Sequence, residues 1–275
     1  MKNKLINIFL ILALVAGLSL LLYPTVSDYW NSLHASQAVA SYDQAVKSMD
    51  EGKYDELLQR AGQYNRDLFL RGSLFALTDE EREDYSSQLD IDGSGVMGYI
   101  EIPTIKVSLP IYHGTSDDVL QVAVGHLEWS SLPVGGESTH CVLSGHRGLP
   151  SAKLFTNLDQ LREGDTFTLR VLDEVLCYEV DQIRIVEPQD TAALLPEPGQ
   201  DLCTLVTCTP YGVNTHRLLV RGHRIETPDS ADAIRVTSDA MQIEPILVAP
   251  AVGVPLVLLA VAILLLSDRR HRRKN

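Results

Sequence analysis

Two long apolar runs without any charged residue interrupt an otherwise mixed pattern of hydrophobic and polar positions. They cover residues 5–23 and 246–267. A helix needs about 20 apolar residues to cross the hydrocarbon layer, so both runs predict transmembrane helices. The first run could instead be a cleaved signal peptide. It exceeds the usual apolar region of such peptides, however, and no clear Ala-x-Ala site follows it, which favours an uncleaved anchor.

Apolar residues recur every three or four positions between residues 30 and 68, which is the spacing of an amphipathic helix. The two stripes consist of Val39, Tyr42, Val46 and Met49, and of Leu57, Ala61, Tyr64 and Leu68. The polar sequence Asp50-Glu51-Gly52-Lys53 separates the stripes and predicts a turn between two helices. We interpret residues 24–68 as a helical pair that forms a stalk or packs on a neighbouring domain.

Residues 69–95 are acidic, contain Ser and Gly, and have only a weak pattern. They predict a linker with room for one helical turn, leading into the main domain.

From residue 96 to residue 226, apolar residues fall in short β-like segments separated by Gly, Pro and Asp. No amphipathic helix of about 10–15 residues alternates with these segments, so the pattern argues against a parallel βαβ sheet and favours a closed barrel or a sandwich. Residues 227–245 are polar, contain Pro and predict a linker to the second apolar run. The expected fold is mostly β, with a helical pair before it and a transmembrane helix at each end.

Basic residues flank both apolar runs, in residues 1–4 and in residues 268–275. Short basic flanks stay in the cytoplasm, so we expect both termini inside and residues 24–245 outside. Of the 23 basic and 36 acidic residues, seven and one respectively lie in the two end segments, which leaves a net charge of −19 on residues 24–245. Such a surface argues against nucleic acid and against anionic lipid as partners of this domain.

Four cysteines fall in this extracytoplasmic portion: Cys141, Cys177, Cys203 and Cys208. An even number in such a compartment is compatible with disulfides. Three of the four lie inside apolar β-like runs, where a buried thiol is a common filler. No pair has CxxC spacing, so a zinc site has no local support.

Cys208 is the candidate nucleophile. Alternation along the segment DLCTLVTC puts Cys208 and Val206 on one strand face and Cys203 on the other. Pro210 cannot continue a strand ladder, so the thiol of Cys208 should lie at a strand end and open onto a loop. On this pattern alone, a buried structural thiol is an equally good interpretation.

A cysteine nucleophile needs a basic or cationic neighbour, because the thiolate is the reactive species. His146 ends the apolar run CVLSG and precedes Arg147-Gly148, again at a strand-to-loop boundary. His113, His126 and His140 also lie near predicted strand ends, so position alone leaves all four histidines open.

Arg217 is the candidate for stabilising negative charge. The loop at 209–215 returns the chain into a β-like segment, and in a hairpin Arg217 would share one end with Cys208. A guanidinium there could bind a substrate carbonyl and the oxyanion of acyl transfer. A surface salt bridge is the alternative. Arg221 and Arg224 lie further from the loop and are weaker candidates.

Two segments carry a family resemblance. TLVTCTPYGVNTHRLLVRG and HCVLSGHRGLPSAKLF closely resemble the signature regions of sortases, specifically the class C, pilus-assembling group. The similarity extends through GVMGYIEIPTIKVSLPIYHGTS and VGHLEWSSLPVGGESTH, and so covers nearly all of residues 95–226. A second, C-terminal membrane span is also typical of class C.

The resemblance implies a closed barrel of about eight strands and a cysteine transpeptidase that needs no cofactor. It assigns Cys208 as the nucleophile, His146 as the general acid/base, and Arg217 as the residue that holds substrate and oxyanion. The implied substrate is a Leu-Pro-x-Thr-Gly-like sorting signal on a secreted pilin, and the acceptor is a pilin lysine. Anchoring of surface proteins to peptidoglycan is the alternative reaction, and a non-catalytic, membrane-tethered scaffold is the alternative of another class.

One departure from the family concerns the lid. Many class C members carry an Asp-Pro-aromatic motif before the barrel, whereas residues 67–95 contain no proline. Phe75, flanked by Leu74 and Leu77, is the best available apolar anchor. We therefore expect a loosely held lid with Phe75 near the barrel.

Overall fold

The computed structural model describes residues 2–72 and 77–227, in two units that are taken separately: residues up to 30, and residues from 31 onward. Helix α1 (Lys2–Lys47) contains the first apolar run, and one described segment, Leu5–Lys47, is long and apolar enough to cross a membrane. The second apolar run, residues 246–267, lies outside the described residues. A membrane span at the C-terminal end therefore stays a prediction.

Helix α2 (Glu51–Arg71) follows α1 after a break at residues 48–50, close to the turn that the polar sequence predicts. It ends at Gly72, whose φ of 68° is the left-handed conformation in which glycine is favoured. Within the second unit, α1 is bonded to the barrel through Tyr42. The hydroxyl of Tyr42 donates to the carbonyl of Met97 at 2.9 Å and accepts from the backbone N–H of Leu172 at 2.7 Å.

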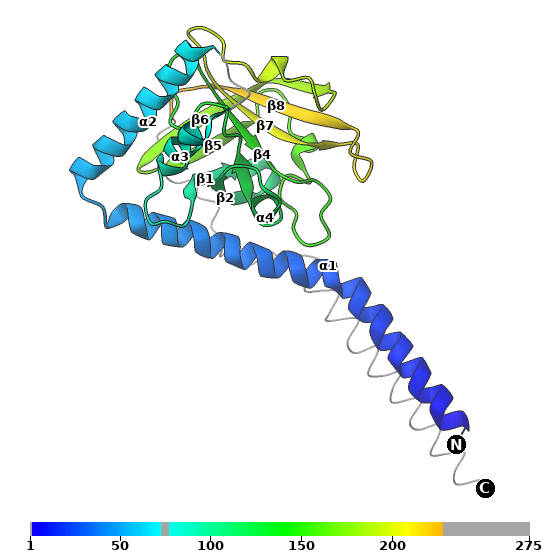
Figure 1. Ribbon diagram of the computed structural model, residues 1–275. Helices are drawn as coiled ribbons and strands as arrows, with labels where there is room; N and C mark the ends of the chain where they lie inside the picture. The colour runs from blue at the N-terminus through cyan, green and yellow to red at the C-terminus, as the bar shows by residue number, and fades with distance from the viewer. Residues whose placement is uncertain (1, 73–76, 228–275) are drawn as a thin grey trace. The chain divides into compact units, whose positions relative to one another are not determined.

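Eight strands form a closed barrel, in the order β1-β2-β3-β4-β7-β8-β6-β5 (Figure 1). The barrel prediction is confirmed and the sandwich alternative is excluded. The pairs β2–β3 and β4–β7 are parallel, and the others are antiparallel. The strands are β1 (Val96–Ile102), β2 (Val107–His113), β3 (Val124–His126), β4 (Thr139–Ser144), β5 (Thr166–Val171), β6 (Glu174–Val186), β7 (Asp201–Thr209) and β8 (His216–Arg224).

Short helical elements occupy the connections between strands. They are η1 (Pro103–Ile105), α4 (Asp117–Leu120), η2 (Leu158–Gln160) and η3 (Ala192–Leu194).

Alternation along the strands creates two apolar regions on opposite faces of the same sheet. The barrel interior is closely packed: a Cβ added at Gly222 would come within 2.8 Å of the Phe167 ring. Outside the barrel, Val142, Val206 and Leu219 from β4, β7 and β8 form a smaller cluster with Leu194 of η3. We call these four residues the outer cluster. Because strand side chains alternate with a period of two, Cys208 shares the face of Val206.

The segment before the barrel is more ordered than its pattern indicates. Instead of a linker with one helical turn, it contains the nine-residue helix α3 (Asp79–Ser87). Tyr85 is the single buried residue of this helix. One buried position makes no apolar stripe, so the sequence pattern did not indicate a helix here. The local signal was a capping box: Thr78 accepts from the backbone N–H of Glu81, and the Glu81 carboxylate accepts from the backbone N–H of Thr78.

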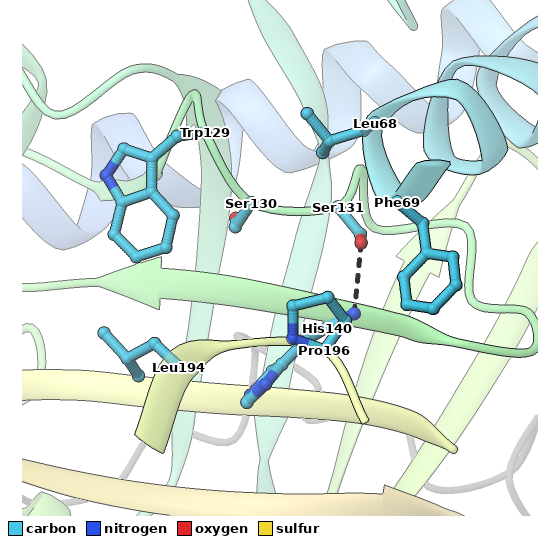
Figure 2. A pocket seen from close by; sticks show the side chains of 8 residues that line it. All are labelled: Leu68, Phe69, Trp129, Ser130, Ser131, His140, Leu194 and Pro196. Atoms are coloured by element: carbon cyan, nitrogen blue, oxygen red, sulfur yellow. Dashed lines mark hydrogen bonds between the residues drawn. The ribbon is translucent and has the colours of Figure 1, made fainter. Parts of the chain in front are cut away.

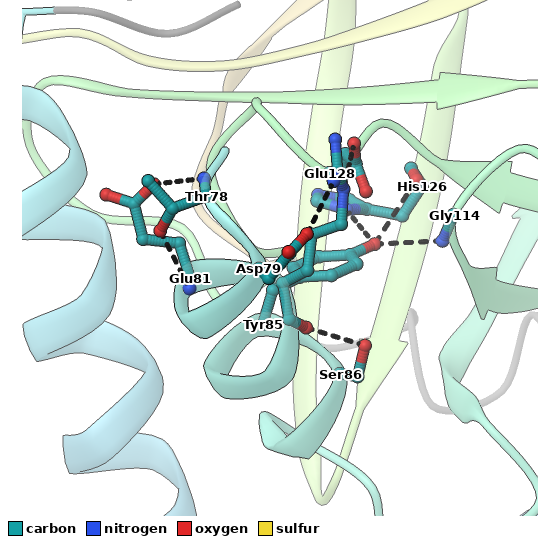
Figure 3. Close-up of polar contacts among 9 residues, drawn as sticks. Thr78, Asp79, Glu81, Tyr85, Ser86, Gly114, His126 and Glu128 are labelled. Atoms are coloured by element: carbon teal, nitrogen blue, oxygen red, sulfur yellow. Dashed lines mark hydrogen bonds and ion pairs between the residues drawn. The ribbon is translucent and has the colours of Figure 1, made fainter. Parts of the chain in front are cut away.

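Helix α3 is bonded to the barrel through Tyr85 (Figure 3). The Tyr85 hydroxyl accepts from the backbone N–H of Gly114 at 2.9 Å and lies 2.9 Å from Nδ1 of His126. Leu77 and Leu89, on either side of the helix, are also buried. Residues 77–89 are therefore attached to the barrel, and the expectation of a loosely held lid stays a prediction. Phe75, the candidate lid residue, lies outside the described residues.

Candidate active site

Cys208 differs from the other cysteines in its exposure. All four cysteines lie in the described part of the chain and are free thiols, and only Cys208 is partly exposed. Its strand, β7, ends one residue later at Thr209. The thiol is therefore on the outer face of the barrel, at the end of a strand, as the alternation predicts.

Arg217 is the register partner of Cys208. In the antiparallel pair β7–β8 the two residues lie directly opposite each other. Directly opposed residues project to the same face, with Cβ atoms about 4.5–5.5 Å apart. Nη1 of Arg217 donates to the carbonyl of His216 at 3.1 Å and less closely to that of Asn214 at 3.4 Å. Within residues 2–72 and 77–227 the guanidinium has no carboxylate partner, so its remaining donors are available to a ligand.

His146 lies on the other side of β7. Strands β4 and β7 are parallel with a constant offset of 62 residues, from Thr139–Asp201 to Ser144–Val206. Bonds beyond the strand continue this register, since the Gly145 N–H donates to the carbonyl of Val206 at 3.1 Å. Extended two residues past the end of β4, the same offset leads to His146 at the level of Cys208. The structure thus pairs Cys208 with Arg217, and it sets the loop that begins at Gly145 next to the end of β7.

The other candidate histidines are occupied elsewhere. His126 is fully buried against Tyr85, and its Nε2 lies 2.8 Å from the carbonyl of Ser131. The two ring nitrogens of His113 lie 3.0 and 2.7 Å from the carbonyls of Gly95 and Gln88. Burial lowers the pKa of His113. None of these partners belongs to the Cys208 end of β7.

His140 connects the outer face of β4 to the β6–β7 loop. Its Nδ1 lies 3.0 Å from the carbonyl of Leu195, and its Nε2 lies 2.7 Å from Oγ1 of Thr204. Burial lowers the pKa of His140, which favours the neutral ring. A neutral imidazole that donates from Nδ1 and accepts at Nε2 satisfies both contacts.

The two weaker arginine candidates form ion pairs. Arg221 binds Asp181 at 2.9 Å and Glu197 at 2.7 Å. These carboxylates raise the pKa of Arg221. Arg224 lies 3.9 Å from Asp201. Both arginines are therefore structural in this arrangement, unlike Arg217.

A hollow on the outer face lies between α2, the β3–β4 loop and the β6–β7 loop (Figure 2). Its cavity volume is about 10 Å³. That is room for about one water molecule, and not for a peptide side chain. The lining residues are Leu68, Phe69, Trp129, Ser130, Ser131, His140, Leu194 and Pro196. Leu194 also belongs to the outer cluster, so the β6–β7 loop covers part of this face.

No group of three or more His, Cys, Asp or Glu side chains in the described ranges could hold a metal ion. The arrangement on β4, β7 and β8 instead offers a thiol, an imidazole and a guanidinium. These are the groups that acyl transfer through a thioester requires.

Comparison with known proteins defines the class. A sortase domain model matches residues 100–225. Sortase D of Bacillus subtilis is 33% identical over 131 residues, which are 46% of this chain and 63% of that protein. The chain thus spans a little under two thirds of this relative. The chain belongs to the sortase family, whose members are cysteine transpeptidases.

Solved structures indicate which class of sortase this chain is most similar to. The crystal structure of sortase C1 from Streptococcus agalactiae is 55% identical, with a TM-score of 0.69, and the match covers 70% of this chain and all of that one. The crystal structure of Streptococcus pneumoniae sortase C, whose title refers to pilin substrate specificity, is 45% identical with a TM-score of 0.63. That match covers 70% of this chain and 97% of that one. These similarities support class C within the family.

Proposed function

We propose that this protein is a membrane-anchored class C sortase that polymerises pilin subunits, with Cys208 as nucleophile, His146 as general acid/base and Arg217 as the group that binds substrate and oxyanion. The observation that supports the proposal is the register of β8 with β7, which sets Arg217 opposite Cys208, together with the parallel pairing of β4 with β7, whose offset leads toward His146.

The reaction begins at a Leu-Pro-x-Thr-Gly-like signal. The Cys208 sulfur attacks the carbonyl carbon of the signal's threonine, and the guanidinium of Arg217 stabilises the negative oxygen that develops. His146 protonates the departing glycine amine, so the C–N bond breaks and a thioester remains on Cys208. A lysine amine of the next pilin then attacks the thioester and forms a new amide. The thiol is restored, and no cofactor takes part.

The remaining geometry suits an extended peptide. The outer cluster continues the same face along β4, β7 and β8, and supplies an apolar surface next to Cys208. The side chains of Val142 and Val206 alternate with residues that point into the barrel. A sorting signal lying along this face would bury its leucine and proline there, after the β6–β7 loop moves outward.

The proposed location is the outer surface of a cell membrane, with both termini in the cytoplasm and residues 24–245 outside. It rests on the apolar character of α1, on the apolar run at 246–267 and on the basic flanks of both. The sorting signals and acceptor lysines would be met there on secreted pilins.

The test uses the full-length protein in detergent micelles and a synthetic Leu-Pro-x-Thr-Gly peptide. Mass spectrometry should detect a thioester on the peptide that contains Cys208. Adding a pilin that carries the acceptor lysine should discharge it, whereas the same pilin with that lysine replaced by arginine should not. A thioester discharged only by peptidoglycan amines would favour cell-wall anchoring. Absence of any thioester would leave the scaffold interpretation.

A further inference from the structure

Arg147 follows His146 directly, and its side chain turns back onto the end of β7. The side chain is only 9% exposed. Nη1 donates to Oγ1 of Thr209 at 3.1 Å, and Nη2 binds the carboxylate of Asp159 in η2. The guanidinium carbon lies 5.9 Å from the centre of the Tyr211 ring, within the range of a cation–π contact.

A second set of bonds holds the residue on the other side of His146. The N–H of Gly145 donates to the carbonyl of Val206 at 3.1 Å, and its carbonyl accepts from Oγ1 of Thr207 at 2.7 Å. The chain is therefore attached to β7 immediately before His146 by residues 206–207 and immediately after it by Thr209. Cys208 lies between these two attachment points.

We propose that Arg147 is a positioning residue that keeps His146 in register with Cys208. The inference rests on the proposed function, because positioning His146 affects the reaction only if His146 and Cys208 act together in it. After His146 the chain is also held within its own loop, where the carbonyl of His146 accepts from the N–H of Phe155 at 3.1 Å and the N–H of Gly148 donates to Oγ1 of Thr156 at 3.1 Å. The Arg147–Thr209 bond is what ties this loop to the end of β7, beside Cys208. A displacement of about 1 Å in a catalytic group can lower the rate about 100-fold.

The fork of the guanidinium is what suits Arg147 to this task. Its planar donors reach Thr209 and Asp159 at the same time, while its central carbon lies over the Tyr211 ring. A lysine would keep the charge but could not make these contacts together. The Asp159 side chain is 46% exposed. Its ion pair should therefore contribute little by itself, since exposed pairs are weak.

The test compares Arg147→Lys and Thr209→Val in the full-length protein. Thr209→Val removes the acceptor oxygen and keeps the shape of the side chain, so it remains informative even if Arg147→Lys folds poorly. Arg162→Lys is the matched control, because Arg162 lies in the same β4–β5 connection with an exposed side chain. Four quantities are measured: kcat and KM for cleavage of the sorting peptide, the pH dependence of Cys208 alkylation by iodoacetamide, and the melting temperature.

We expect Arg147→Lys to lower kcat about 100-fold and Thr209→Val about tenfold, with KM changed by less than about threefold. The pH profile of Cys208 alkylation should change in both variants and stay unchanged in Arg162→Lys. A role confined to stability would lower the melting temperature and leave that profile unchanged, and this result would overturn the inference. So would a fully active Arg147→Lys. If the profiles change as expected but even the unaltered protein fails to cleave the peptide, the positioning role stands and the proposed reaction is refuted.

Discussion

Strand β7 carries two cysteines, five residues apart, in opposite surroundings. Cys203 faces the barrel interior, is completely buried, and is paired in register with Cys141 of β4. Cys208 faces outward, is partly exposed, and lies opposite Arg217 of β8. Because the spacing is odd, alternation alone puts the two thiols on different faces.

The difference shows that the exposure of a thiol depends on the strand face it occupies and on its distance from the strand end. Burial raises the pKa of the Cys203 thiol well above its usual value, and its contact with Cys141 raises it further. Cys203 therefore stays protonated and behaves as a small apolar side chain. Cys208 has a cationic neighbour and an open approach, which a nucleophilic thiol needs.

The largest expected effect is the loss of thioester formation when Cys208, but not Cys203, is replaced. Cys208→Ala should abolish the thioester with a sorting peptide, because no other described thiol is exposed. Cys203→Ala should keep the thioester and lower the free energy of unfolding by about 1 kcal/mol, the usual scale for a buried substitution. Mass spectrometry and chemical denaturation measure the two effects. A thioester in Cys208→Ala would contradict the assignment of the nucleophile.

The rate of alkylation should differ between the exposed thiol of Cys208 and the buried thiols. Iodoacetamide should label Cys208 at least about 1,000-fold faster than Cys141 or Cys203, since opening a core strand costs about 4 kcal/mol or more. Peptide mapping after timed exposure measures the rates. In denaturant the difference should disappear, because all the thiols are then equally accessible. Equal rates without denaturant would mean that the barrel opens far more readily than its packing indicates.

Arg217→Ala should test the cationic neighbour. We expect a fall in kcat of about 100- to 1,000-fold for peptide cleavage, the range seen when an oxyanion donor is removed. Arg162→Ala is the control, because Arg162 is an exposed arginine in the β4–β5 connection. Steady-state kinetics with the same peptide measure both variants. If Arg217→Ala is as active as Arg162→Ala, Arg217 is an ordinary surface arginine and the proposed role is wrong.

The smallest effect concerns His140, which shares the outer face with Cys208 but is buried. Burial lowers the pKa of His140 below its ordinary 6.5. Below pH 6.5 the unfolded chain therefore takes up a proton before the folded one. His140 thus contributes stability that is complete above pH 6.5 and is lost as the pH falls toward its folded pKa. Replacing it with Gln should make the free energy of unfolding less dependent on pH in this window, measured by urea denaturation.

The barrel could be predicted from the sequence because its strands are short, alternating and separated by turn residues. The position of Cys208 also followed from local rules, since Pro210 ends the strand and alternation sets its face. Helix α3 could not be predicted from its pattern. Its surface is polar throughout, and the burial of Tyr85 depends on His126 and Gly114, which lie far along the chain.

The choice among the histidines likewise depended on distant partners. His140 is occupied by Leu195 and Thr204, and no local pattern reveals those contacts. The placement of His146 beside Cys208 requires the parallel pairing of β4 with β7. Sequence alternation does not specify which strands become neighbours, so only the family resemblance could suggest it.

The parallel pairing of β4 with β7 also bears on how the chain folds. Parallel neighbours cannot be joined by a tight turn, and here β5 and β6 are made before β7 can return beside β4. Contacts between residues so far apart in sequence form slowly. The segment that begins at Gly145 and the strand that carries Cys208 are therefore apart until the last strands close the barrel. The arrangement around Cys208 is thus completed only at the end of folding, and a partly folded chain lacks it.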